Sequence, residues 1–309
     1  MRPFLLFFLT ALVLVMLTAC NEATDDDRPA VVATTNVVGD LVRTIGGDDI
    51  ALTVLMGPGV DPHLYRASEG DAARMSEADI VFYNGHHLEG RMTDLFEQMG
   101  RRGVRTVALA ETLPDSLLQT SADYPGNRDP HVWLDASLWM LAVDAVEEAL
   151  AEADPTHAAV YTERAAAYRD ELQETHRYVE ERAQKVPEER RVLITSHDAF
   201  GYFGAAYGFE VRGLQGISTA TEAGTRDVQQ MAAFIVEREI PVLFAESSVP
   251  ERGIEAVRRA ARDRGFPAEF GGTLYGDALG DRGTPEGTYT GMMRHNIDTI
   301  VDGLLRDPA

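Results

Sequence analysis

Two residue types are almost missing from this chain of 309 residues, which has a single cysteine, Cys20, and a single lysine, Lys185. One cysteine excludes an internal disulfide framework and any zinc or iron–sulfur site built from several thiolates. Basic side chains are scarce as a whole: 28 Lys and Arg stand against 50 Asp and Glu, giving a formal net charge of −22. Such a surface repels polyanions, so the composition argues against a nucleic-acid partner and suits either cations or a salty habitat.

Two catalytic motifs are also absent. The chain has neither a Gly-x-x-x-x-Gly-Lys-Ser/Thr phosphate loop nor the His-Glu-x-x-His helix of zinc proteases. Apolar residues make up 45% of the chain and charged residues 25%, which is ordinary for a folded protein. The length predicts one large or two medium domains with a sizeable core.

An apolar run from Phe4 to Ala19 lies directly before the lone cysteine and follows the positive charge of Arg2. The run is short for a spanning helix, which needs about 20 residues, and is typical of a cleaved secretory signal. The closing Leu-Thr-Ala-Cys resembles a bacterial lipobox. It predicts a signal peptide over residues 1–19, a lipidated Cys20, and a polar tether over residues 20–29. An uncleaved anchor and a plain signal with an incidental cysteine are the alternatives. The lipid would hold the protein to a membrane outside the cytoplasm, in the periplasm or at the cell surface.

From residue 30 onward, short β-branched runs alternate with helical patterns, which indicates parallel βαβ units. We expect an N-terminal α/β lobe over residues 30–153. Its predicted strands lie near residues 31–37, 50–56, 80–83 and 104–108.

A charged segment with hardly a breaker follows Asp154-Pro155 and continues to about Lys185. Its apolar residues recur at near-helical spacing, which predicts one linking helix within residues 154–187, about 45 Å long at 1.5 Å per residue. Strand patterns then resume in a predicted C-terminal α/β lobe over residues 188–309. Its strands are expected near residues 191–195, 210–214, 241–246 and 268–271.

Four side chains able to bind a metal follow predicted strands, where α/β sheets present their ligand sites. His63 and His131 each end an Asp-Pro-His tripeptide, His197 lies in a Thr-Ser-His-Asp stretch, and Asp277 lies in Leu-Tyr-Gly-Asp. The aspartate of each Asp-Pro-His is placed to orient its imidazole. Singly these signals are weak, since Asp-Pro-His is usually a turn and a lone histidine is often a core residue. Two from each half of the chain would place an ion in the cleft between the lobes.

Together these motifs resemble the cluster A-I solute-binding lipoproteins of ABC importers for zinc and manganese, particularly their TroA-like branch. The likeness covers essentially the whole chain after the leader. It also includes the stretches Asn84-Gly85-His86-His87-Leu88-Glu89-Gly90, Gly213-Leu214-Gln215-Gly216 and Glu246-Ser247-Ser248.

The resemblance implies that His63, His131, His197 and Asp277 bind the ion. It implies a fold of two α/β lobes, each with a mostly parallel sheet, joined by one long helix with the metal in the interlobe cleft. It further implies a monomer that captures Zn²⁺ or Mn²⁺ and delivers it to a membrane permease driven by a cytoplasmic ATPase.

The ligand set alone leaves the metal open. Three neutral imidazoles and one carboxylate at tetrahedral number suit Zn²⁺, whereas Mn²⁺ favours oxygen ligands and six-coordination. A bidentate Asp277 would enlarge the site enough for Mn²⁺.

Two other functions compete with carriage of an ion. A metal-dependent hydrolase would use His63, His131 and His197 as zinc ligands and leave a position open for water. A carboxylate from Asp277 closes that position, so we expect no enzyme. A surface adhesin is suggested by the lipid anchor but has no sequence mark of its own. The remaining histidines are interpreted as capping, packing or solvated residues, and Glu246 either as a partner of a ligand or as a strand-end acid.

Overall fold

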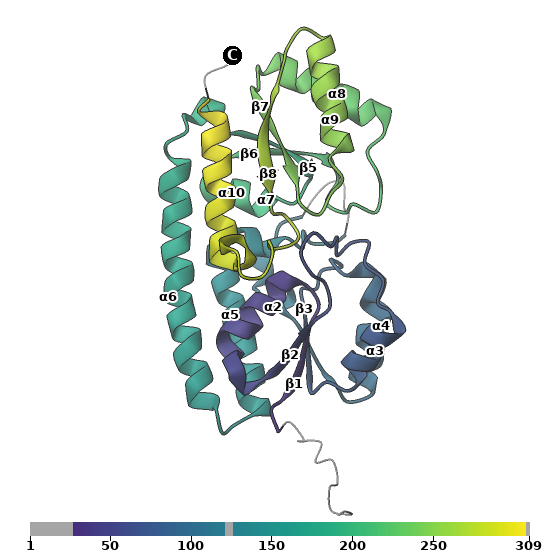
Figure 1. Cartoon of the computed structure of the whole chain (residues 1–309), viewed down its shortest axis with the longest axis vertical. Coiled ribbons are helices and arrows are strands. Elements are labelled where there is room, and N and C mark those ends of the chain that lie inside the picture. Colours follow the sequence, from purple (N-terminus) through teal and green to yellow (C-terminus); the bar gives the residue numbers. More distant parts are fainter. Residues whose placement is uncertain (1–26, 121–125, 307–309) are drawn as a thin grey trace, which may run out of the picture.

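Two α/β lobes lie one above the other beside a long helix in the computed structural model, which describes residues 27–120 and 126–306 (Figure 1). The expected two-lobe architecture with parallel sheets is therefore confirmed. The predicted signal peptide and the lipidated Cys20 lie outside the described residues.

The first lobe contains a four-stranded parallel sheet in the order β2-β1-β3-β4. Val31 and Ala33 pack on one face against helices α2 and α5, while Val32 packs on the other face against α3 and α4. Both faces are covered, which explains why these strands read as nearly continuous apolar runs. The elements are β1 (Ala30–Ala33), α2 (Asn36–Gly46), β2 (Ala51–Val54), α3 (Glu69–Ser76), β3 (Ile80–Tyr83), α4 (Thr93–Arg101), β4 (Arg105–Ala108) and α5 (Ala136–Ala153).

The first strand is shorter than the sequence predicts. It ends at Ala33 because helix α2 already begins at Asn36, where Thr35 caps it by accepting a hydrogen bond from the backbone N–H of Val38 at 3.2 Å. The apolar residues that follow belong to the buried face of the helix rather than to the strand. Helix α3 was not predicted, although its Ser68 and Asp71 form a capping box.

The second lobe contains two parallel pairs, β5-β6 and β7-β8, and β5 contacts β7 between them. Helices α8 and α9 cover one face of these strands with an apolar cluster of their own. The short helix α7 was not predicted. The elements are β5 (Val192–His197), α7 (Gly201–Tyr207), β6 (Glu210–Gln215), α8 (Thr225–Glu237), β7 (Val242–Glu246), α9 (Arg252–Asp263), β8 (Glu269–Leu274) and α10 (Tyr289–Leu304).

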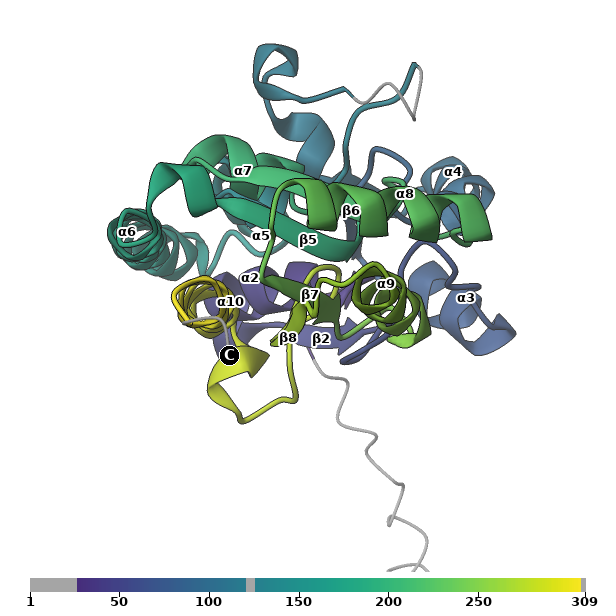
Figure 2. The ribbon, with the colours of Figure 1, turned by 90° about the horizontal axis from the view of Figure 1, so that it is seen from above.

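Helix α6 (Ala158–Ala183) lies within the range predicted for the linking helix and is about 39 Å long at 1.5 Å per residue. It contacts α2 and α5 of the first lobe and α7 and α10 of the second. Seen from above, α6 and α10 form one edge of the molecule (Figure 2). One apolar cluster continues from α2 and α5 through Leu172 and Val179 of α6 to α10, so the helix joins the lobes by packing as well as by connectivity.

Among the residues that the structure describes, no helix is both long and apolar enough to cross a membrane.

Candidate metal centre

His63, His131, His197 and Asp277 converge at the boundary between the lobes, each at most 5% exposed. One ligand atom from each residue lies within 4.8 Å of the other three. Within residues 27–120 and 126–306, this is the one group of three or more histidines, cysteines or acids arranged in this way. The sequence therefore predicted the convergence correctly.

The spacing of these atoms fits four-coordination. Nε2 of His63 lies 3.3 Å from Nε2 of His131, and one oxygen of Asp277 lies 3.4 Å from Nε2 of His131. The other oxygen of Asp277 lies 3.3 Å from Nε2 of His197 and 3.8 Å from Nε2 of His63. In a tetrahedron with metal–ligand bonds of about 2.0–2.1 Å, neighbouring ligand atoms are about 3.3–3.4 Å apart. The group can therefore surround a zinc-sized ion with little rearrangement.

The carboxylate of Asp277 is the part of the group that most needs a cation to neutralise it. Among the described residues, neither of its oxygens has a hydrogen-bond partner, and neither has Nε2 of His197, although all are fully buried. Buried polar atoms are normally satisfied, so these are the atoms that a cation would satisfy. Because the two oxygens face different imidazoles, the carboxylate can bind an ion through one oxygen or both.

Two of the imidazoles lie against carboxylates, one in each lobe. Asp129 accepts hydrogen bonds from the backbone N–H of His131 at 2.9 Å and from its Nδ1 at 2.7 Å. Glu246 at the end of β7 accepts from the backbone N–H of His197 at 2.8 Å, and its other oxygen lies 2.8 Å from Nδ1 of that histidine. Each carboxylate fixes the ring so that Nε2 faces the centre, which is the usual support of a metal-binding histidine. The sequence reading had left the role of Glu246 undecided.

Asp61 does not repeat this arrangement, although its Asp-Pro-His motif is the same. Its Oδ1 accepts from the backbone N–H of His63 at 2.9 Å, while its Oδ2 accepts from the hydroxyl of Thr219 in the second lobe at 2.6 Å. Asp61 therefore orients the backbone of the His63 turn and connects it to the second lobe, rather than holding the ring. Thr219 could not be predicted, because nothing in its surroundings in the sequence indicates a contact 158 residues away.

Burial and ion pairing shift the pKa values of these residues in opposite directions, and pairing prevails for His131, His197 and Asp277. Burial lowers the pKa of His63 to about 3, so this imidazole is neutral at physiological pH. Burial also disfavours charge on His131, but attraction to Asp129 and Asp277 prevails and raises its pKa to about 9. The pKa of His197 likewise rises well above its usual value because Asp277 and Glu246 outweigh its burial. Burial would raise the pKa of Asp277, yet His197 and His131 hold it far below the usual range.

Two glycines allow the close approach on which the centre depends. A Cβ on Gly276 would lie 2.3 Å from an oxygen of Glu246, and a Cβ on Gly213 would lie 2.3 Å from the backbone nitrogen of Asp198. Neither position has room for a side chain, because strand β6 and the segment after β8 pass directly against the residues that carry and support His197.

The chain matches the family described as ZnuA, zinc-uptake complex component A, periplasmic, over residues 31–303. The chain belongs to the ZnuA family. It is 49% identical to the zinc-binding protein TroA of Treponema pallidum over 289 residues, which cover 93% of this chain and 92% of TroA. It is 44% identical to the manganese-binding lipoprotein MntA of Bacillus subtilis over 279 residues, which cover 90% of each chain. A solved structure of the periplasmic zinc-binding protein TroA from Treponema pallidum superimposes with a TM-score of 0.87, covering 90% of this chain and 100% of that one at 49% identity.

The resemblance to metal-binding lipoproteins of ABC importers is thus confirmed at the level of the family, and so is the two-lobe fold. In this ZnuA-family chain, the other histidines lie away from the centre. His157 stands at the start of α6 with its Nδ1 2.5 Å from Asp154, and His176 contacts the hydroxyl of Tyr207. His86 and His87 both have positive φ, at 47° and 62°.

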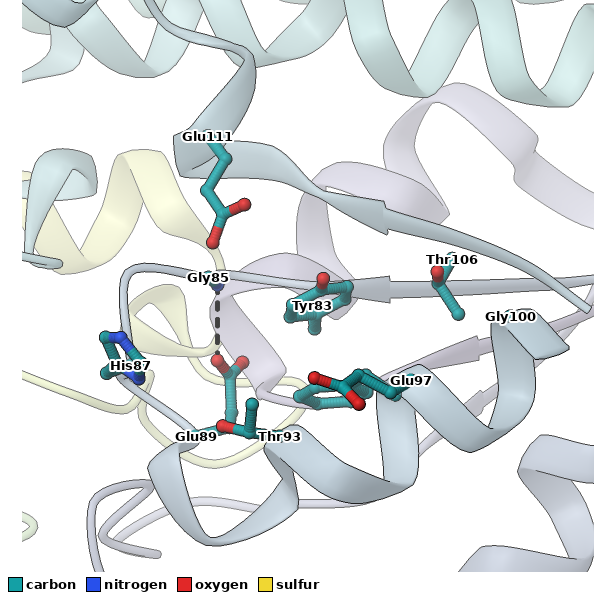
Figure 3. A pocket seen from close by; sticks show the side chains of 10 residues that line it. Tyr83, Gly85, His87, Glu89, Thr93, Glu97, Gly100, Thr106 and Glu111 are labelled. Atoms are coloured by element: carbon teal, nitrogen blue, oxygen red, sulfur yellow. Dashed lines mark hydrogen bonds between the residues drawn. The ribbon is translucent and has the colours of Figure 1, made fainter.

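A separate cavity of about 350 Å³ lies between β3, β4 and α4 (Figure 3). Tyr83 and Phe96 line this cavity and stack on each other with their ring centroids 4.0 Å apart. His87, Glu97 and Glu111 also line it. Glu89 in its wall is buried and accepts a hydrogen bond from the backbone N–H of Gly85 at 3.2 Å. The four converging residues of the metal centre take no part in this cavity.

Proposed function

We propose that this protein is an extracytoplasmic solute-binding protein of an ABC importer. In this role it captures one Zn²⁺ or Mn²⁺ ion with His63, His131, His197 and Asp277 and delivers it to a membrane permease. The observation that carries the proposal is the convergence of four buried ligand atoms within 4.8 Å of one another, two from each half of the chain.

The chemistry of the centre supports carriage better than catalysis. Three imidazoles and a carboxylate fill a tetrahedral site, whereas a catalytic zinc keeps one position open for water. Both supporting carboxylates, Asp129 and Glu246, are committed to histidines and are therefore not free to act as a general base. The relatives TroA and MntA are named for binding zinc and manganese.

We further propose an arrangement of segments that suits this role. Residues 1–19 are a cleaved signal peptide, Cys20 carries the lipid, and residues 20–29 tether the folded part to a membrane. Residues 30–153 and 188–309 are the two lobes and residues 154–187 link them. A monomer docks on the permease, and the cytoplasmic ATPase supplies the energy for transport.

Zinc and manganese are both suitable cargo. Ligand softness favours Zn²⁺ at an imidazole-rich centre, while the two inward-facing oxygens of Asp277 offer Mn²⁺ the harder donor that it prefers. Which ion is carried in the cell then depends on metal availability as well as on affinity.

The proposal is tested by metal analysis of protein secreted with its leader and purified without chelator. We expect about one Zn²⁺ or Mn²⁺ per chain by mass spectrometry. The doubly substituted His131→Ala, His197→Ala protein should carry none, while the matched control His157→Ala should retain the full content. Equal metal in the double variant and the wild type would overturn the assignment of the centre. A Cys20→Ser variant should in turn leave the membrane fraction.

A further inference from the structure

The segment that carries Asp277 follows a strand of the second lobe, yet it is fastened largely to the first. Asn36, the first residue of α2, forms two hydrogen bonds with the backbone of Leu279: its Oδ1 accepts from the N–H at 2.9 Å and its Nδ2 donates to the carbonyl at 3.1 Å. Trp133 donates from Nε1 to the carbonyl of Gly276 at 2.9 Å. Two residues of the first lobe therefore bind the backbone on both sides of Asp277.

The second lobe holds this segment at its beginning and again after Asp277, where the N–H of Gly280 donates to the carbonyl of Glu286 at 2.8 Å. Asn296 of α10 accepts from the backbone N–H of Tyr275 at 2.9 Å and donates to its carbonyl at 2.8 Å. Between Tyr275 and Gly280, the bonds from Trp133 and Asn36 hold the backbone. The backbone on either side of Asp277 is therefore attached to the first lobe.

Trp133 is the central member of this attachment. It is 1% exposed and lies two residues after His131, so the same short segment carries a histidine ligand and holds the aspartate. Its carbonyl accepts a hydrogen bond from the hydroxyl of Tyr289 at 2.7 Å, which fixes the backbone from which the indole projects. Because Trp133 is buried, its hydrogen bond to the carbonyl of Gly276 contributes more stability than the same bond would at the surface.

His197 is held differently. It ends strand β5, and both of its contacts to a supporting carboxylate are with Glu246 of the adjacent strand β7. Both contacts that orient this histidine come from the second lobe. By attachment, Asp277 therefore goes with His131 and the first lobe, and His197 with the second. The turn of His63 follows β2 of the first lobe and is tied to Thr219 of the second through Asp61.

We propose that Trp133 and Asn36 are positioning residues that keep Asp277 with the first lobe. When the lobes move apart, His131 and Asp277 remain together as a preformed pair of ligands, and His197 joins or leaves the ion with the second lobe. This inference rests on the proposed function and adds an order to it: His197 completes the site on loading and departs first on release.

The test is a double-mutant cycle between Trp133→Phe and Asp277→Ala, read out as Zn²⁺ affinity by competition with a chelator. Phenylalanine removes the N–H donor and keeps most of the buried ring. We expect Trp133→Phe to weaken Zn²⁺ binding by about tenfold in the wild-type background, as loss of a supporting bond does. It should change affinity by less than about twofold in the Asp277→Ala background, because the residue acts through that aspartate.

Trp139→Phe is the matched control. Trp139 is also fully buried, and its ring stacks on Tyr289, but its Nε1 makes no hydrogen bond to the Asp277 segment in the described part of the chain. It should leave Zn²⁺ affinity unchanged in both backgrounds. Co²⁺ absorption should shift in Trp133→Phe, because the carboxylate loses its fixed position, and should remain as in the wild type in Trp139→Phe.

Asn36→Ala replaces Trp133→Phe in the same double-mutant cycle if the Trp133→Phe protein fails to fold. The inference is overturned if either positioning variant weakens binding equally with and without Asp277, or does not weaken it at all. Absence of Zn²⁺ and Mn²⁺ binding by the wild-type protein would instead contradict the proposed function, so the two failures are distinct.

Discussion

Glu246 holds His197 at two points, with one oxygen 2.8 Å from the backbone nitrogen and the other 2.8 Å from Nδ1. Both residues are at most 2% exposed, so water does not weaken either contact. The histidine is thereby fixed in backbone and ring at once, and its Nε2 has a single direction left in which to bind.

Replacing Glu246 with Gln should lower Zn²⁺ affinity by about 10- to 100-fold, because the imidazole loses a charged partner that orients it and raises its basicity. Competition titration against a chelator measures the change. Glu237→Gln, an exposed substitution on α8, is the control and should bind as the wild type does. Equal affinity of the two variants would show that Glu246 contributes nothing to the centre.

Zn²⁺ affinity should rise steeply with pH between about 6 and 9. His131, whose pKa lies at about 9, and His197, whose pKa is raised well above its usual value, both hold a proton in the metal-free protein at neutral pH. The ion must displace these protons, so binding strengthens as pH rises toward those values and weakens as it falls. His63, with a pKa of about 3, is already neutral and adds no pH dependence in this range. Titration in weakly buffered solution should release about two protons per ion. An affinity that is flat from pH 6 to 8 would contradict the protonation of both histidines.

Asp277→Ala should weaken Mn²⁺ binding more than Zn²⁺ binding. The substitution removes the only oxygen ligand of the four, leaving three imidazoles that suit zinc better than manganese. Parallel titrations with the two ions give the ratio of losses. His157→Ala serves as the control, and an equal loss for both ions would argue that Asp277 does not contribute to the preference between them.

Leu172→Ala should destabilise the protein by about 2–5 kcal/mol, since it removes a fully buried side chain from the apolar cluster that joins both lobes to α6. Denaturant unfolding of the metal-free protein measures the loss. Leu141→Ala removes the same atoms from a side chain that is 40% exposed on α5 and should cost less than about 1 kcal/mol. A similar cost for both variants would mean that α6 contributes little to cohesion between the lobes.

The convergence of these four residues could be predicted because their signals are local. Each of His63, His131, His197 and Asp277 stands in a short motif after a strand or turn, and parallel strands bring such positions to one edge of a sheet. Helix α6 was predictable for a similar reason, since a long charged segment without breakers has few other structures available.

The supports of the centre could not be predicted in the same way. The bonds from Trp133 to Gly276 and from Asn36 to Leu279 join residues 143 and 243 positions apart. Each is a single side chain bonded to a backbone atom, which leaves no periodicity and no composition bias in the sequence. The register shift between Leu243 and Phe244 in the second lobe leaves no sign in the sequence either, because the residues on both sides of it are apolar.

The unbroken apolar interior that passes from α2 and α5 through α6 to α10 has a consequence for how the chain folds. If the two halves were separated, each would expose the surface that the other now covers, and α6 would lose half of its buried stripe. We therefore expect the lobes to unfold together as one cooperative body, although each sheet is built from one continuous half of the chain.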